Sequence, residues 1–210
     1  MFTGIVEEIG TVDRLVTEQN VIKLSIACET ILEDMHIGDS ISVNGACLTV
    51  TSFNQKSFDV NVIKGTENKT YLNQLTKGSS VNLERAMPSQ GRFGGHFVLG
   101  HVDEVGKVLK IRPSSNSNIM TIQCPKSITD QMVQQGSITV DGTSLTIFRL
   151  AEGQFDIHLI PETKRATILG QKRVGDTVHL EADMLFKYVQ KAISNQNTEL
   201  TPDKLAQFGF

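Results

Sequence analysis

The chain has 210 residues, of which 39% are hydrophobic and 20% charged, and it carries a formal net charge of −3. This apolar fraction suffices for a sizeable core and excludes an intrinsically disordered protein, and the slightly acidic balance argues against a nucleic-acid-binding protein with a basic surface. No apolar run approaches the ~20 residues of a membrane span, and Met1–Val6 lacks the basic and apolar regions of a signal peptide.

The first half of the chain has the pattern of short β-strands. Four runs alternate polar and apolar side chains and are rich in β-branched residues, which is typical of half-buried strands. These runs are Ser40–Val43, Cys47–Thr51, Ser57–Ile63 and Ser80–Leu83. Asn44-Gly45, between the first two runs, indicates a tight hairpin turn. A short helix is predicted at Thr30–Met35, where the threonine hydroxyl can cap the first turn.

The second half repeats the first. With a shift of 97 residues, Ser40–Thr49 falls on Ser137–Thr146, and six of the ten positions are identical. Near the start, Gly4–Gly10 pairs with Gly100–Gly106 at a shift of 96. A repeat of this length is too long for a solenoid unit and corresponds to a whole small domain.

The repeat predicts a mainly β protein with two tandem six-stranded antiparallel β-barrels related by duplication. Asp141-Gly142 is the second hairpin signal, and Ser127–Gln134 is the second short helix. We expect one barrel in residues 1–96, the other in residues 97–193, and a C-terminal tail in residues 194–210.

An α-helix is predicted at Asp183–Ser194, after the last strand. Its apolar side chains recur at helical spacing and form one stripe. They are Leu185, Tyr188, Val189, Ala192 and Ile193. Such a stripe needs a cover, and the sequence leaves two covers open: the adjoining barrel or another subunit.

The positions at which the halves differ are the candidates for chemistry, because two related pockets with different roles must differ. His101 is matched by Ile5, Ser144 by Cys47, and Pro161-Glu162 by Lys64-Gly65. Histidine titrates near neutral pH and is a natural general base, and a hydroxyl or thiol can add to an electrophile.

Each of these residues also has a purely structural interpretation. Cys47 can be a small core residue, and Ser144 can bond only the backbone of a turn. His96 and His101 can both be surface histidines, and His158 is either structural or lines a ligand pocket.

Several kinds of site are not indicated. The sequence has no phosphate-binding glycine loop and no dinucleotide fingerprint. The histidines lack the spacing of metal ligands, so we expect no metal. Cys28, Cys47 and Cys124 lack paired spacing, which argues against a disulfide framework. We therefore expect a protein of the cytoplasm.

Five ordered motifs, spread over residues 1–190, resemble the riboflavin synthase family and its lumazine-binding domain. They are Met1–Glu7, Val43–Val50, Gly94–Asp103, Val140–Thr146 and His158–Thr163. The resemblance implies a transferase that moves a four-carbon unit between two molecules of 6,7-dimethyl-8-ribityllumazine. The products are riboflavin and 5-amino-6-ribitylaminouracil, and no cofactor or metal is required.

The resemblance also implies the residues of the site. Those with catalytic roles are His101 as the base, Cys47, Ser144 and Thr146 as groups that activate a nucleophile, and Phe2 as a shield. Substrate contacts carry over to Gly4, Ile5, Val6, Cys47, Leu48, Thr49, Asn61, Val62, Ile63, Lys64, Gly65, Thr66, Gly100, His101, Val102, Gln135, Ser144, Leu145, Thr146, His158, Leu159, Ile160, Pro161, Glu162 and Thr163. Ser40, Asp141 and Asp183 are further family positions near the site.

The family resemblance implies a homotrimer whose sites form between the N-terminal barrel of one subunit and the C-terminal barrel of its neighbour. The helix from about residue 184 then makes the trimer contact. Association with a lumazine synthase stays open. Neither nucleic acid nor membrane is an expected partner.

Two departures from the family pattern concern the site. Ile63-Lys64-Gly65-Thr66 replaces a segment with a glutamate, and Gln135 replaces a lysine. The alternative function is a non-catalytic lumazine- or flavin-binding paralogue, such as an optical antenna or carrier protein. The retained Cys47, His101 and Ser144 favour the enzyme. A flavin-reductase barrel, a third alternative, would need a flavin motif that the sequence lacks.

Overall fold

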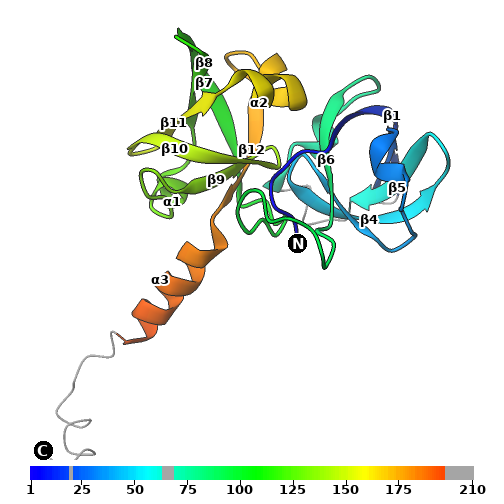
Figure 1. Ribbon diagram of the computed structural model, residues 1–210, viewed down its shortest axis with the longest axis horizontal. Coiled ribbons are helices and arrows are strands. Elements are labelled where there is room, and N and C mark those ends of the chain that lie inside the picture. Colours follow the sequence, from blue (N-terminus) through cyan, green and yellow to red (C-terminus); the bar gives the residue numbers. More distant parts are fainter. Residues whose placement is uncertain (19–20, 63–68, 197–210) are drawn as a thin grey trace, which may run out of the picture.

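The computed structural model describes residues 1–18, 21–62 and 69–196. Two closed antiparallel barrels lie side by side (Figure 1). The strands of the first are β1 (Glu8–Glu18), β2 (Val21–Ala27), β3 (Ser40–Val43), β4 (Ala46–Phe53), β5 (Ser57–Val62) and β6 (Ser80–Arg85). Those of the second are β7 (Glu104–Ser114), β8 (Ser117–Gln123), β9 (Ser137–Val140), β10 (Thr143–Ala151), β11 (Gln154–Leu159) and β12 (Thr177–Ala182).

The predicted duplication is confirmed in the strand order and in local detail. The first barrel closes in the order β1-β2-β5-β4-β3-β6, and the second has the equivalent order. β1 and β7 share the same pattern of buried and exposed residues. A β-bulge interrupts β1 between Val12 and Arg14, and its counterpart interrupts β7 between Val108 and Lys110. The strong twist at each bulge helps to close a small barrel.

Each barrel has its own apolar core, because alternate residues of every strand point inward. Leu24, Ile26 and Phe58 fill the first core, and Met120, Ile122 and Phe155 fill the second. Short helical turns lie between strands: η1 (Thr30–Leu32), η3 (Leu72–Gln74), α1 (Lys126–Thr129), α2 (Pro161–Ala166) and η4 (Ile168–Gln171).

The first short turn begins at Thr30, as predicted, but the predicted threonine and serine caps are wrong. The residue before η1 is Glu29 and the residue before α1 is Pro125, and neither turn has a side-chain cap. In η1 the amide N–H groups of Glu29 and Ile31 instead donate to the Glu8 carboxylate, at 2.6 and 3.1 Å. A carboxylate from β1 therefore replaces the local threonine cap. Both turns are also shorter than predicted.

The barrels meet turn against turn. Asn44-Gly45 has φ angles of 49° and 83°, and Asp141-Gly142 has 44° and 78°. Two left-handed residues are what a tight two-residue hairpin requires, so both predicted turns are confirmed. A Cβ on Gly142 would lie 2.8 Å from the Gly45 amide nitrogen. Only glycine allows the two backbones to approach this closely.

His179 of β12 links the second barrel to the first. Its Nε2 accepts a hydrogen bond from the Tyr71 amide at 2.8 Å, and its Nδ1 lies 2.7 Å from the Asn44 carbonyl oxygen. Because Nε2 must accept, Nδ1 carries the proton, and the ring is neutral. Burial lowers the pKa of His179 and favours this form.

Asn82 of β6 makes the same link in the opposite direction. Its Oδ1 accepts from the Ile168 amide at 2.8 Å, and its Nδ2 donates to the Asp141 carbonyl at 2.7 Å. Positions 82 and 179 are equivalent under the 97-residue shift, as are positions 71 and 168. The two links therefore relate the barrels by an approximate two-fold symmetry.

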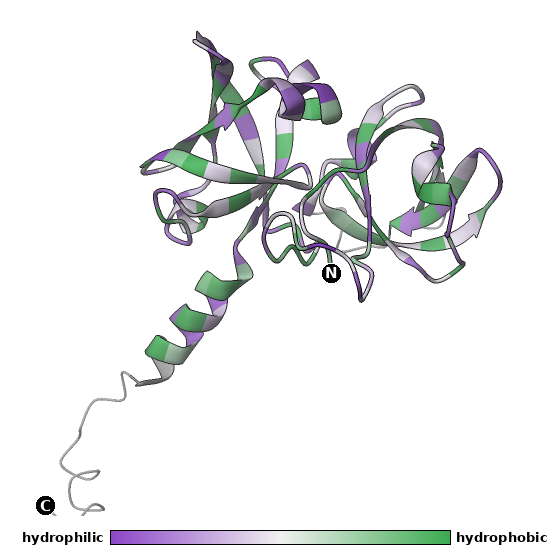
Figure 2. Ribbon diagram, viewed as in Figure 1, coloured by the Kyte–Doolittle hydropathy of each residue, from purple (hydrophilic) through white to green (hydrophobic). Residues whose placement is uncertain are grey.

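The C-terminal helix α3 (Met184–Gln196) extends away from the second barrel (Figure 1). Its apolar residues Leu185, Tyr188, Val189 and Ile193 are each more than half exposed, and the ribbon of Figure 2 shows hydrophobic residues at intervals along the helix. The cover that the stripe needs is therefore not the adjoining barrel. No described helix is long and apolar enough to cross a membrane.

The predicted domain boundary between residues 96 and 97 stays a prediction. It falls within the segment between β6 and β7, so the strands of each barrel lie on the expected side. Residues 197–210, which make up most of the predicted tail, lie outside the described residues.

Candidate active site

The second barrel carries a concave pocket of about 810 Å³ along β10, β11 and the start of α2. It is a suitable size for a ring system with a polar chain. Seven predicted contact residues line it: Gln135, Ser144, Leu145, Thr146, His158, Ile160 and Thr163. Leu159 instead points into the barrel core, and the Glu162 carboxylate pairs with Arg165 at the surface. Pro161 is exposed beside this pocket at the start of α2.

At one end of this pocket Ser144 is hydrogen-bonded to a histidine. Ser144 Oγ lies 2.7 Å from His96 Nδ1, and His96 Nε2 lies 3.1 Å from Thr139 Oγ1. With Nε2 protonated and donating to Thr139, Nδ1 is free to accept the serine proton. A hydroxyl, a base within hydrogen-bond reach and a third group that orients the base form the arrangement that activates a nucleophile.

Burial keeps His96 in the form that this role needs. Burial lowers the pKa of His96, and the nearby Asp183 carboxylate opposes the shift. The shift favours the neutral imidazole, which can accept a proton. Asp183, predicted near the site, acts on the site through this charge.

Glycine lets the histidine reach the serine. A Cβ on Gly95 would lie 2.1 Å from the Thr3 carbonyl oxygen and 2.8 Å from Ser144 Cβ. The chain therefore passes between the N-terminal segment and β10 only because residue 95 has no side chain. His96 is buried, so its interpretation as a surface histidine is wrong. The Gly94-Gly95 pair before it was the one available signal of a close approach.

The equivalent place in the first barrel holds a thiol. Cys47 and His101 line a smaller pocket of about 260 Å³, together with Lys69, Thr70 and Val102. Cys47 is half-buried and His101 is exposed. The segment between the barrels thus supplies one histidine to each pocket: His96 beside Ser144, and His101 in the pocket of Cys47.

Two leader segments, each preceding the first strand of a barrel, cross to the opposite barrel. We define them as residues 2–6 and 98–102. The Gly4 carbonyl accepts the Ser144 amide at 2.7 Å, and the Gly100 carbonyl accepts the Cys47 amide at 2.9 Å. Phe2 pairs with Val98 in an isolated bridge between the leaders and is fully buried.

Several predicted residues lie away from these two pockets. Leu48 and Val62 belong to the first core, and Asn61 lines a shallow groove on the outer wall. Thr49 is exposed on β4, Val6 is half-buried, and Ser40 only caps the end of β3, where its carbonyl accepts the Ala86 amide. Ile63, Lys64, Gly65 and Thr66 lie outside the described residues.

Asp141 belongs to the contact between barrels and not to either pocket. It is fully buried, accepts the Tyr71 hydroxyl at 2.7 Å and pairs with Lys172 at 3.0 Å. The expectation that it lies near the substrate site stays a prediction. A buried carboxylate of this kind must be paired because an isolated charge in the core is costly.

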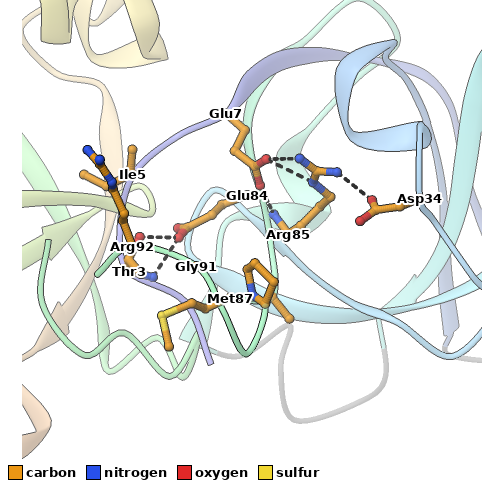
Figure 3. Close-up of a pocket in the computed structure, with 11 residues that line it drawn as sticks. Thr3, Ile5, Glu7, Asp34, Glu84, Arg85, Met87, Gly91 and Arg92 are labelled. Atoms are coloured by element: carbon orange, nitrogen blue, oxygen red, sulfur yellow. Dashed lines mark hydrogen bonds and ion pairs between the residues drawn. The ribbon is translucent and has the colours of Figure 1, made fainter. Parts of the chain in front are cut away.

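Ile5 lines a further groove of about 270 Å³ beneath the first leader (Figure 3). The groove contains Arg85, whose guanidinium binds both Glu7 and Asp34 at 2.5 Å. This cation is already neutralised by two carboxylates. Arg85 thereby fastens Glu7, the residue after the first leader, to β6.

Comparisons with known proteins agree with this architecture. The profile of the family described as "Lumazine binding domain" matches residues 3–86 and 99–183. A riboflavin synthase of Bacillus subtilis is 47% identical over 99% of this chain and 96% of its own length. One from Actinobacillus pleuropneumoniae is 40% identical over the full length of both, and one from Schizosaccharomyces pombe is 41% identical over 92% of this chain and 94% of its own.

Solved structures share the fold. The structure of LumP complexed with riboflavin has a TM-score of 0.80 and 25% identity, and covers 87% of this chain and 99% of that one. LumP complexed with 6,7-dimethyl-8-(1'-D-ribityl) lumazine has a TM-score of 0.79 at 24% identity, with the same coverage. With two lumazine-binding domains and full-length relatives at 40–47% identity, the chain belongs to the riboflavin synthase family of transferases.

Proposed function

We propose that this chain makes riboflavin from two molecules of 6,7-dimethyl-8-ribityllumazine, with one molecule held by each kind of pocket. The Ser144–His96 pair beside the 810 Å³ pocket is the observation that carries the proposal. A carrier of lumazine needs a pocket, but it has no need of a hydroxyl with its own base.

The chemistry requires little beyond placement and proton transfer. The substrate ring is electron-poor, so its C7 methyl group is acidic and C7 itself accepts nucleophiles. Holding two such rings against each other turns a bimolecular step into an effectively unimolecular one. The four-carbon exchange is balanced without an external oxidant or reductant.

Each pocket contributes a different group. His101 takes the methyl proton of the molecule in the first barrel, where it lines the pocket with Cys47. In the second barrel, His96 accepts the proton of Ser144, and the serine oxygen activates C7 or a water beside it. Thr146 and His158 line the same pocket and bind the polar edge and ribityl chain. Phe2, packed between the leaders, holds both in place.

The proposed assembly is a homotrimer in which the first barrel of one subunit faces the second barrel of its neighbour. The exposed apolar stripe of α3 supports this proposal, because a stripe of this kind needs a cover and the adjoining barrel does not supply one. The three free cysteines support a location in the cytoplasm, where thiols stay reduced. Association with a lumazine synthase remains open.

The test is turnover. Purified protein is incubated with 6,7-dimethyl-8-ribityllumazine alone, and riboflavin is followed by its absorbance and fluorescence. We expect riboflavin and 5-amino-6-ribitylaminouracil in equal amounts. Tight binding of the substrate without product would instead support the lumazine-carrier alternative, toward which the LumP complexes point.

A further inference from the structure

Two buried glutamates fasten the leader segments, and they do so in equivalent ways. Glu84 of β6 accepts the Thr3 amide at 2.7 Å and the Thr3 hydroxyl at 2.9 Å (Figure 3). It also accepts the Gly4 amide at 3.0 Å. Glu181 of β12 accepts the Leu99 amide at 2.7 Å. Positions 84 and 181 are equivalent under the 97-residue shift, so both halves keep the same arrangement. We call it the clamp: a buried glutamate that accepts hydrogen bonds from a leader segment.

These carboxylates are unusual in being almost fully buried, with 5% of Glu84 and 3% of Glu181 exposed. Burial raises the pKa of each, and the leader amides oppose the shift. Backbone N–H groups that point at a carboxylate can stabilise it without a cation. The clamp therefore depends on the leader being in place, and the leader depends on the clamp.

Each clamped leader contacts the reactive residue of the opposite barrel. The leader held by Glu84 in the first barrel bonds the Ser144 amide through Gly4, in the second barrel. The leader held by Glu181 in the second barrel bonds the Cys47 amide through Gly100, in the first.

At these contacts there is no room for a side chain on either glycine. A Cβ on Gly4 would lie 2.6 Å from Ser144 Cβ, and a Cβ on Gly100 would lie 2.6 Å from Cys47 Cβ. Each glycine has a φ of +78°, which side chains disfavour. A small shift of a leader therefore moves the reactive residue or uncovers it.

We propose that Glu84 and Glu181 are crossed positioning residues, each of which fixes the reactive side chain of the opposite barrel through a clamped leader. Glu84 thereby fixes the position of Ser144 relative to His96, and Glu181 holds the second leader over Cys47. The proposal rests on the assigned site residues, but not on turnover.

The test uses the thiol of Cys47 as a reporter in the full-length chain without substrate. Cys28 and Cys124 are buried, one beside each core, so they report general unfolding of the first and second barrel. The rate of alkylation by iodoacetamide is measured at each cysteine by mass spectrometry, in the parent protein and in Glu181→Gln and Glu84→Gln.

Glutamine keeps the size of glutamate but removes the charge that the leader amides solvate. In Glu181→Gln the side-chain oxygen can still accept the Leu99 amide, but the hydrogen bond is no longer charge-assisted. We expect Cys47 to react about fivefold faster, which is the effect of weakening one charge-assisted hydrogen bond to a neutral one, with Cys28 and Cys124 unchanged. Glu84→Gln is the matched control. It should leave the alkylation rate of Cys47 within about 1.5-fold of the parent rate, since a loss of much less than one hydrogen bond is expected at Cys47. The same variant should lower kcat for riboflavin formation.

Equal acceleration of Cys47 in both variants, or in neither, would overturn the proposal. If Glu181→Gln exposes Cys124, the second barrel has opened, and Glu181→Asp takes its place, since it keeps the charge but is too short to reach Leu99. A chain that alkylates as expected yet forms no riboflavin would contradict the proposed function and leave the crossed clamp standing.

Discussion

Ser144 and His96 should act as one unit in turnover. Their 2.7 Å contact joins the hydroxyl to its base, so removing either partner removes the same proton transfer. A positioned general base typically contributes 10²–10⁴-fold to the rate, or about 3–5 kcal/mol of barrier. We expect His96→Gln and Ser144→Ala each to lower kcat by a factor in this range.

The double variant distinguishes a coupled pair from two independent residues. If the pair is one unit, the double variant should be no more than about threefold slower than the slower single variant. Independent contributions would multiply to a loss of about 10⁴–10⁸-fold. The assay is riboflavin fluorescence at saturating substrate, and a multiplicative loss would refute the coupling. His36→Gln is the control, since the His36 side chain is 81% exposed and its Nδ1 lies 3.8 Å from Asp39.

The pH profile gives a second reading of the same pair. Burial depresses the folded pKa of His96, so the fall in kcat that protonation of His96 causes should lie at a lower pH than for an ordinary histidine. His96→Gln should remove this part of the acidic fall, whereas His36→Gln should retain it. An unchanged acidic limb in His96→Gln would assign the titration to another group.

The remaining predictions concern stability and assembly. His179 has a depressed folded pKa, so the unfolded chain binds more protons at acidic pH. The free energy of unfolding should therefore be full above pH 6.5 and fall as the pH decreases below it. Urea titrations should find that this free energy depends less on pH in His179→Asn. Gly142→Ala should lower the free energy of unfolding by about 2–4 kcal/mol, through a left-handed φ and the close Gly45 backbone. Gly78→Ala, left-handed but in open space, should cost only about 1–2 kcal/mol, and equal losses would refute the close-contact argument. Val189→Asp on α3 should reduce the mass in analytical ultracentrifugation from trimer to monomer, whereas Lys191→Asp on the same helix should do so much less.

The fold was predictable because its signals are local or repeated. Hairpin turns such as Asn44-Gly45 need only two residues with left-handed backbone, and the 97-residue repeat carries the four predicted strand runs of the first half onto the second. The helix caps were not predictable, because the amides of η1 bind Glu8, a residue 21 positions away from Glu29. The residues near Thr30 give no sign that Glu8 will bind these amides.

The candidate site was predictable only in part, for the same reason. Ser144, Cys47 and His101 were found because the halves differ there. The contact of His96 with Ser144 spans 48 residues and depends on how the segment between the barrels passes β10. The place of Asp141 in the contact between the barrels was not predictable, because its partners, Tyr71 and Lys172, come from distant turns.

The two-fold links between the barrels are made by unlike residues, Asn82 on one side and His179 on the other. In a symmetric dimer of single barrels, any substitution would appear twice and would have to suit both halves. Fusion into one chain lets a mutation fall on one half alone. Two features are changes of this kind. One is the buried polar cluster of Tyr71, Asp141 and Lys172, and the other is the contrast between a serine and a cysteine at the two pockets. Duplication within one gene thus allowed two equivalent pockets to acquire separate tasks while the shared interface kept its geometry.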